Sequence, residues 1–239
     1  MLNGKTALVA GGTAGIGLAV AEEYRRLGAD VVVGGRRAEP GERSVVLDVA
    51  DEQSFEAALT DAEEHVGKLD VLVLNAGVGH APRPIAQTGS NSARRVIETN
   101  LLGTFYGLKH GPGHMRDGGS IIITSSISAV TGTGFEGVYG ATKAAVSALA
   151  RSGAIDLGPR GIRVNAVQPG PTWTDMNAMP EALLQITAPL GRKGTVEDQV
   201  GVYVFLASDA SAYLTGQAIS VDGGVTAGYS QALMGALVA

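Results

Sequence analysis

The sequence contains no cysteine. This absence excludes disulfide bonds, cysteine-based zinc sites and a thiol nucleophile together. No apolar run approaches the roughly 18–20 residues that a membrane-spanning helix requires. The N-terminus also lacks the basic region and long apolar stretch of a signal peptide. We therefore expect a cytoplasmic protein.

Charge is also scarce. Lys and Arg number 18, Asp and Glu number 23, and the formal net charge is −5 at pH 7. A weakly acidic chain has no electrostatic attraction for nucleic acid or for an anionic membrane. Hydrophobic residues make up 45% of the 239 positions, which is ample for one core. With no linker or composition break, we predict a single domain over residues 1–239.

Seven short aliphatic runs alternate with longer helical patterns. The runs are nearly continuous, which is typical of strands covered on both faces. They occupy residues 6–10, 31–33, 44–47, 71–74, 120–124, 162–167 and 218–221, and the helical patterns occupy 16–27, 53–66, 92–109, 138–157 and 196–208. This succession predicts an α/β fold with a Rossmann-type, doubly wound parallel sheet and helices on both faces. Residues 36–43 leave too little room for a helix, so we expect a loop there.

A glycine-rich turn follows the first aliphatic run. Gly11, Gly15 and Gly17 have the spacing Gly-x-x-x-Gly-x-Gly at the start of the first helix. Such glycines allow a tight turn, a close backbone approach to a pyrophosphate and close helix packing. A turn without a ligand is the alternative, but the position between strand and helix favours dinucleotide binding.

Tyr139 and Lys143 are four residues apart in a helical pattern, so their side chains share one face. A nearby ammonium is expected to lower the tyrosine pKa and to make Tyr139 a general acid/base. Ser126 follows the fifth run, at the sheet edge where ligands bind in parallel α/β folds. Taken alone, these residues fit an ordinary helix and a capped turn equally well.

In this order along essentially the whole chain, the motifs resemble the short-chain dehydrogenase/reductase family, in the subgroup of about this length with a Tyr-x-x-x-Lys pair. The matching positions are Gly11, Gly15, Gly17, Asp48-Val49, Asn75-Ala76-Gly77, Asn100, Ser126, Tyr139, Lys143, Pro169-Gly170, Thr174 and Asp222-Gly223-Gly224.

The resemblance implies hydride transfer between a nicotinamide and a ketone or secondary alcohol, with no metal. The implied catalytic residues are Asn100, Ser126, Tyr139 and Lys143. Tyr139 would exchange the proton, Ser126 would bind the substrate oxygen, Lys143 would stabilise the phenolate and Asn100 would hold a water. The implied cofactor contacts are Gly11, Thr13, Gly15, Ile16, Gly17, Arg36, Arg37, Asp48, Val49, Asn75, Ala76, Gly77, Tyr139, Lys143, Pro169, Gly170, Thr172 and Thr174.

The end of the second run favours NADP over NAD. NAD-specific folds carry an acidic residue there, which bonds the ribose 2′-hydroxyl. This chain has Gly35 followed by Arg36 and Arg37, whose guanidinium groups suit a 2′-phosphate. Ala14 departs from the basic residue that many NADP members carry in the glycine turn, so NAD stays the alternative.

The substrate side is expected at Ser128, Phe135, Trp173 and Met176, with residues 171–195 as a mobile lid. The apolar residues of this stretch also fit core or interface packing. His110 and His114 have the spacing of a metal pair, but Gly-Pro-Gly between them disfavours a regular helix. We interpret them as surface histidines.

Two other functions stay open. The first is a 3-oxoacyl-thioester reductase acting on acyl carrier protein, because such enzymes have all the catalytic residues implied here. The enoyl-reductase branch fits less well, because its Tyr and Lys lie farther apart in the sequence. A non-catalytic dinucleotide sensor usually loses the Tyr or the Lys. The resemblance also implies a homotetramer, or else a homodimer, built from the helices near residues 92–109 and 138–157 and the last strand.

Overall fold

A seven-stranded parallel sheet with the order β3-β2-β1-β4-β5-β6-β7 forms the centre of the molecule. The computed structural model describes residues 1–39, 41, 43–174 and 180–238. The strands are β1 Thr6–Ala10, β2 Asp30–Gly35, β3 Ser44–Val46, β4 Leu69–Leu74, β5 Met115–Thr124, β6 Arg163–Pro169 and β7 Ala218–Val221. The predicted Rossmann-type sheet is therefore confirmed.

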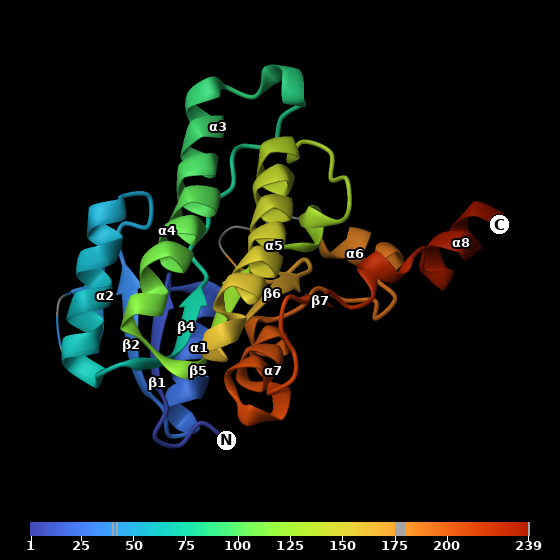
Figure 1. Cartoon of the computed structure of the whole chain (residues 1–239). Helices are drawn as coiled ribbons and strands as arrows, with labels where there is room; N and C mark the ends of the chain where they lie inside the picture. The colour runs from blue at the N-terminus through green and yellow to red at the C-terminus, as the bar shows by residue number, and fades with distance from the viewer. Residues whose placement is uncertain (40, 42, 175–179, 239) are drawn as a thin grey trace.

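Helices cover both faces of this sheet (Figure 1). They are α1 Gly15–Arg26, α2 Glu52–Val66, α3 Ser90–Val96, α4 Gly103–His110, α5 Gly137–Leu157, α6 Glu181–Thr187, α7 Val196–Ala207 and α8 Gln231–Val238. Alternate residues of each strand bury against opposite layers. Leu8, for example, packs into the core with α2 and α5, whereas Val9 packs into the core with α1 and α7. Strands buried on both sides explain the continuous aliphatic runs.

Three segments differ from the sequence expectation or extend it. The predicted helix over 92–109 is divided into α3 and α4 by a π-helical turn, Ile97–Leu102. The short helices α6 and α8 were not anticipated. The link from β2 to β3 contains no helix in its described residues, as expected, and Val46 on the edge strand β3 is half exposed.

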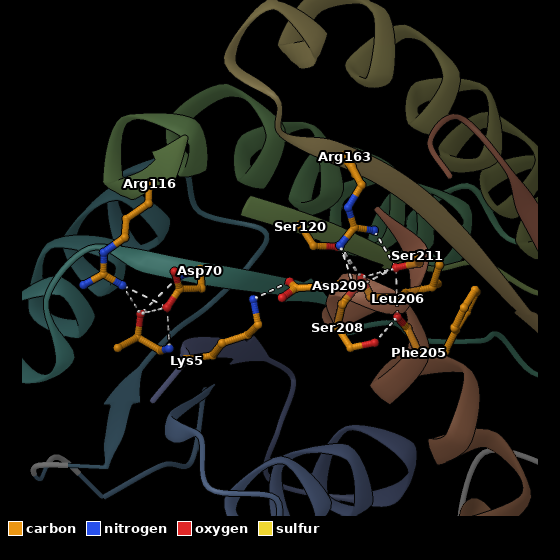
Figure 2. Close-up of polar contacts among 11 residues, drawn as sticks. Lys5, Asp70, Arg116, Ser120, Arg163, Phe205, Leu206, Ser208, Asp209 and Ser211 are labelled. Carbon is orange, nitrogen blue, oxygen red and sulfur yellow. Dashed lines mark hydrogen bonds and ion pairs between the residues drawn. The ribbon is translucent and has the colours of Figure 1, made fainter. Parts of the chain in front are cut away.

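Polar contacts tie together the amino ends of the strands (Figure 2). We call Lys5, Asp70, Arg116, Arg163 and Asp209 the amino-end cluster. Arg116 on β5 pairs with Asp70 on β4 at 2.9 Å, and Lys5 pairs with Asp209 at 3.0 Å. Arg163 at the start of β6 donates to a main-chain carbonyl near the end of α7 at 2.8 Å. In open α/β sheets, ligands bind at the opposite, carboxyl edge.

None of the helices in the described part of the chain has the length and apolarity that a bilayer crossing requires.

Candidate active site

The glycine turn is a backbone cradle at the start of α1. Gly11 and Gly15 have φ values of 82° and 54°, a region that side-chain-bearing residues rarely adopt. A Cβ on Gly17 would lie 2.2 Å from the carbonyl oxygen of Gly11, so only glycine fits. Ala14 caps α1 without a side-chain hydrogen bond, which leaves the first N–H groups of the helix for an anion. These features fit the pyrophosphate of a dinucleotide.

Segments from other strands meet this cradle at the carboxyl edge. Asn75, directly after β4, donates from Nδ2 to the carbonyl of Gly11 at 3.0 Å. Thr174 approaches the cradle so closely that a Cβ on Gly15 would lie 3.6 Å from its methyl carbon. Gly170 is required because a Cβ there would lie 2.5 Å from the Cα of Asp222. The structure thus brings together the glycine, Asn-Ala-Gly and Pro-Gly motifs.

The end of β2 carries no carboxylate, and the side chain of Thr13 lies against it. A Cβ on Gly35 would lie 2.9 Å from the side chain of Thr13, so the glycine turn itself occupies that space. Arg36 and Arg37 follow and are exposed. Asp48, after β3, begins a turn in which its Oδ1 accepts from the N–H of Ala50 at 3.1 Å.

Ser126, Tyr139 and Lys143 gather beyond the carboxyl end of β5. Ser126 lies after the end of β5, directly before the turn Ile127–Ala129, and its Oγ accepts from the N–H of Ser128 at 3.1 Å. Tyr139 lies in the first turn of α5, close enough to Ser126 for a hydrogen bond that lowers its pKa. The Nζ of Lys143 lies 5.7 Å from the centre of the Tyr139 ring. The adjacent Ser125 is buried against α5, so Ser126 is the serine of the pair that faces the tyrosine.

The expectation that Lys143 lowers the pKa of Tyr139 is wrong for this structure. Burial is the largest influence and raises the pKa of Tyr139 above 10.0, and the carboxylate of Glu136 raises it further. Only the Ser126 hydroxyl acts in the other direction. The reason is geometric, because Nζ of Lys143 is directed at the carbonyl of Thr124, 2.7 Å away.

Lys143 is only 3% exposed. This burial lowers its pKa from 10.5 to about 8. The ammonium therefore exchanges its proton close to neutral pH.

A buried network joins this lysine to the glycine turn. The carbonyl of Thr124 accepts from Lys143, and its hydroxyl donates to Oδ1 of Asn75 at 3.0 Å. Asn75 in turn bonds the carbonyl of Gly11. Tyr203 from α7 supports the hydroxyl of Thr124 at 2.8 Å. Sequence reasoning missed Thr124 and Tyr203, because a strand threonine and a buried tyrosine give no distinguishing signal.

Asn100 lies inside the π-helical turn and is 1% exposed. Its Oδ1 accepts from the N–H of Val78 at 2.8 Å, and its Nδ2 donates to the carbonyl of Val78 at 3.0 Å and to the hydroxyl of Thr142 at 3.2 Å. π-helical turns often occur at functional sites. The side chain thus ties the loop after β4 to α5, next to Lys143.

The predicted substrate residues have different surroundings. Phe135 is 57% exposed and Trp173 is 52% exposed. Ser128 donates a hydrogen bond to Glu136, which the sequence did not single out. Met176 lies outside the described residues. Within the expected lid, Trp173 rests on Lys193, whose Nζ lies 4.0 Å from the indole centre.

His110 and His114 contact separate carboxylates of α2. His110 lies 2.9 Å from Glu52, and His114 lies 2.7 Å from Glu63. Among the described residues, no group of three or more potential ligands could hold a metal ion. His110 at the end of α4 and His114 in the turn after it therefore belong to the contact of these segments with α2.

Comparison with known proteins identifies relatives along nearly the whole chain. Residues 10–226 match the family model described as "Enoyl-(Acyl carrier protein) reductase". The chain is 38% identical to L-rhamnose 1-dehydrogenase (NAD(P)(+)) of Sphingomonas sp. (strain SKA58), covering 94% of this chain and 97% of that one. It is 36% identical to the NADP-dependent (R)-specific alcohol dehydrogenase of Lentilactobacillus kefiri, covering 95% and 98%.

A solved structure agrees in fold. The short-chain dehydrogenase/reductase from Serratia marcescens BCRC 10948 superposes with a TM-score of 0.87 at 33% identity, covering 94% of this chain and 99% of that one. The glycine cradle, the Tyr139-x-x-x-Lys143 helix and these matches lead to one conclusion: the chain belongs to the short-chain dehydrogenase/reductase family.

Proposed function

We propose that this chain is an NAD(P)-dependent oxidoreductase that interconverts a ketone and a secondary alcohol. One observation carries the proposal: the hydroxyls of Ser126 and Tyr139 and the ammonium of Lys143 gather at the same sheet edge as the glycine cradle. The names of the rhamnose and alcohol dehydrogenase relatives support it.

A bound nicotinamide supplies or accepts the hydride. In the reducing direction, Tyr139 donates its proton to the substrate oxygen while Ser126 donates a hydrogen bond to the same atom. The raised pKa of Tyr139 keeps this acid protonated at neutral pH. Lys143, whose ammonium donates to the carbonyl of Thr124, would contact the cofactor as the family resemblance implies. Asn100 acts as a positioning residue for the segments around it.

The phenol is the decisive group, and Tyr139→Phe removes it with almost no change in shape. The expected result is a fall in kcat of about 10²–10⁴-fold. Cofactor affinity, read from nicotinamide fluorescence, should fall far less than kcat. Tyr139 would lose one contact to the cofactor, whereas the glycine cradle that fits the pyrophosphate is formed by other segments.

The matched control is Tyr213→Phe, since Tyr213 is fully exposed. Activity close to the unmodified level in Tyr139→Phe, or an equal loss in both variants, would remove Tyr139 from the proposed role.

For the cofactor, we propose a preference for NADP. Arg36 and Arg37 are exposed at the end of β2, and neither takes part in an ion pair among the described residues. A Cβ at Gly35 would lie 2.9 Å from the Thr13 side chain, so a carboxylate at that position requires this side chain to move.

For the assembly, we propose a homotetramer. Two large apolar side chains are exposed on the helices expected to form the interfaces: Phe105 on α4 is 43% exposed, and Ile155 on α5 is 78% exposed. The family resemblance places subunit interfaces on these helices, and such interfaces would bury both side chains.

A further inference from the structure

Two polar residues beside Tyr139 have no part in the mechanism above. Ser128 donates from Oγ to Oε2 of Glu136 at 3.3 Å. The N–H of Ser128 also donates to Oγ of Ser126 at 3.1 Å. Glu136 caps the N-terminus of α5, three residues before Tyr139, so both side chains extend from the same turn. The Ser128–Glu136 pair therefore adjoins the two hydroxyls that receive the substrate oxygen.

The backbone holds this pair firmly in place. Phe135, directly before Glu136, has a φ of 69° and is the only described non-glycine residue with a positive φ. Its carbonyl accepts from the N–H of Arg83 at 3.3 Å. A Cβ on Gly140 would lie 2.9 Å from the carbonyl of Ser128, so α5 packs directly on the Ser128 turn. A bulky residue keeps such a conformation only where its surroundings enforce it, and these residues often line functional sites.

The pair offers hydrogen-bond acceptors and negative charge. A carboxylate only accepts, and Ser128 has committed its proton to Glu136, which leaves lone pairs on both groups. No ion pair of the described residues includes Glu136, and the side chain is half buried. Its charge also reaches the Tyr139 hydroxyl, whose pKa it raises. A substrate group placed here must donate a hydrogen bond, and an anionic group would be repelled.

We propose that Ser128 and Glu136 bind a hydrogen-bond donor of the substrate, a hydroxyl or an ammonium, next to the carbon oxidised or reduced at Tyr139. The inference rests on the proposed function and deepens it. The preferred substrates are polyhydroxylated or amino-substituted alcohols and ketones. A 3-oxoacyl thioester presents only acceptor oxygens at this distance, so it fits the pair poorly.

The test compares four ring alcohols of equal size class: cyclohexanol, 1,2-cyclohexanediol, 2-aminocyclohexanol and 2-hydroxycyclohexanecarboxylate. We expect the unmodified enzyme to oxidise the diol or the amino alcohol with a kcat/KM at least about tenfold above that of cyclohexanol, since a hydrogen bond to a charged group has this effect. The carboxylate should be the poorest substrate. A preference for the amino alcohol over the diol would show that the donor bound by Ser128 and Glu136 is an ammonium. The opposite preference would show that it is a hydroxyl.

Glu136→Gln keeps the size of the side chain and removes its charge. This variant should lose most of the preference for the donor-bearing substrates over cyclohexanol and should gain activity on the carboxylate relative to cyclohexanol. These ratios cancel any change in kcat that comes from the lost charge beside Tyr139, because that change affects all four alcohols alike. Asp156→Asn, at the exposed far end of α5, is the matched control and should change none of these ratios.

The outcomes separate the two proposals. Turnover of all four alcohols without preference, or an unchanged preference in Glu136→Gln, would overturn the inference and leave the proposed function standing. Absence of turnover with every alcohol and both cofactors in the unmodified enzyme would overturn both.

Discussion

Lys143 is a cation held almost without solvent contact. Its ammonium donates to the carbonyl of Thr124, and no carboxylate pairs with it among the described residues. Burying an unpaired charge is unfavourable, and the lowered pKa of about 8 is the expression of this penalty. The fold therefore carries a residue that reduces its stability at neutral pH.

This penalty predicts a pH dependence. Between pH 8 and 10.5 the unfolded state holds the Lys143 proton and the folded state does not, so raising the pH stabilises the folded protein. The full effect is about 3 kcal/mol, since each pKa unit corresponds to about 1.4 kcal/mol. Urea unfolding of the unmodified protein and of Lys143→Met, measured from pH 7.5 to 10, should show the difference between their unfolding free energies shifting in favour of the unmodified protein. Parallel pH profiles would contradict this.

The Tyr139–Lys143 pair was predictable because a spacing of four residues fixes two side chains on one helical face. The pKa direction of Tyr139 was not predictable, since it depends on burial and on Glu136 and Ser126, which only the folded structure brings together. In the same way, the role of Thr124 depends on its main-chain carbonyl, and any residue type would supply that carbonyl.

At the scale of secondary structure, too, local patterns were predictable and contacts between distant segments were not. Strands buried on both faces appear in the sequence as aliphatic runs, so all seven were predicted. The π-helical turn that divides α3 from α4 was missed. It contains Asn100, whose side chain bonds the main chain of Val78, and a contact across 22 residues gives no local pattern in the sequence. The helix α6 was missed because its apolar residues fit a lid equally well.

The loop after β2 carries the cofactor prediction. Removing either guanidinium in Arg36→Ala or Arg37→Ala should lower kcat/KM for NADPH by about tenfold or more, because charge-assisted hydrogen bonds to a phosphate are lost. The value for NADH should change by less than about threefold. Arg94→Ala removes an equally exposed guanidinium on α3 and serves as the control. A large advantage for NADH in the unmodified enzyme would reverse the proposed preference.

At the scale of the whole molecule, the exposed Phe105 and Ile155 predict association. Light scattering at micromolar concentration should give four times the mass of one chain. Ile155→Lys should lower this mass, because a charge would be buried in the contact. Tyr213→Ser, at another fully exposed position, should leave it unchanged. The mass of a single chain for the unmodified protein would refute the proposal.

The amino-end cluster has a consequence for how this enzyme can diverge. At the amino edge of the sheet, Arg116 on β5 pairs with Asp70 on β4, and Lys5 before β1 pairs with Asp209 after α7 (Figure 2). Glu136 and Trp173 follow the carboxyl ends of β5 and β6, at the opposite edge. Substitutions around Glu136 and Trp173 therefore leave the ion pairs of the amino-end cluster intact. Substitutions in the loops at the carboxyl edge can change the substrate preference. The register of the strands, set at the amino edge, stays the same.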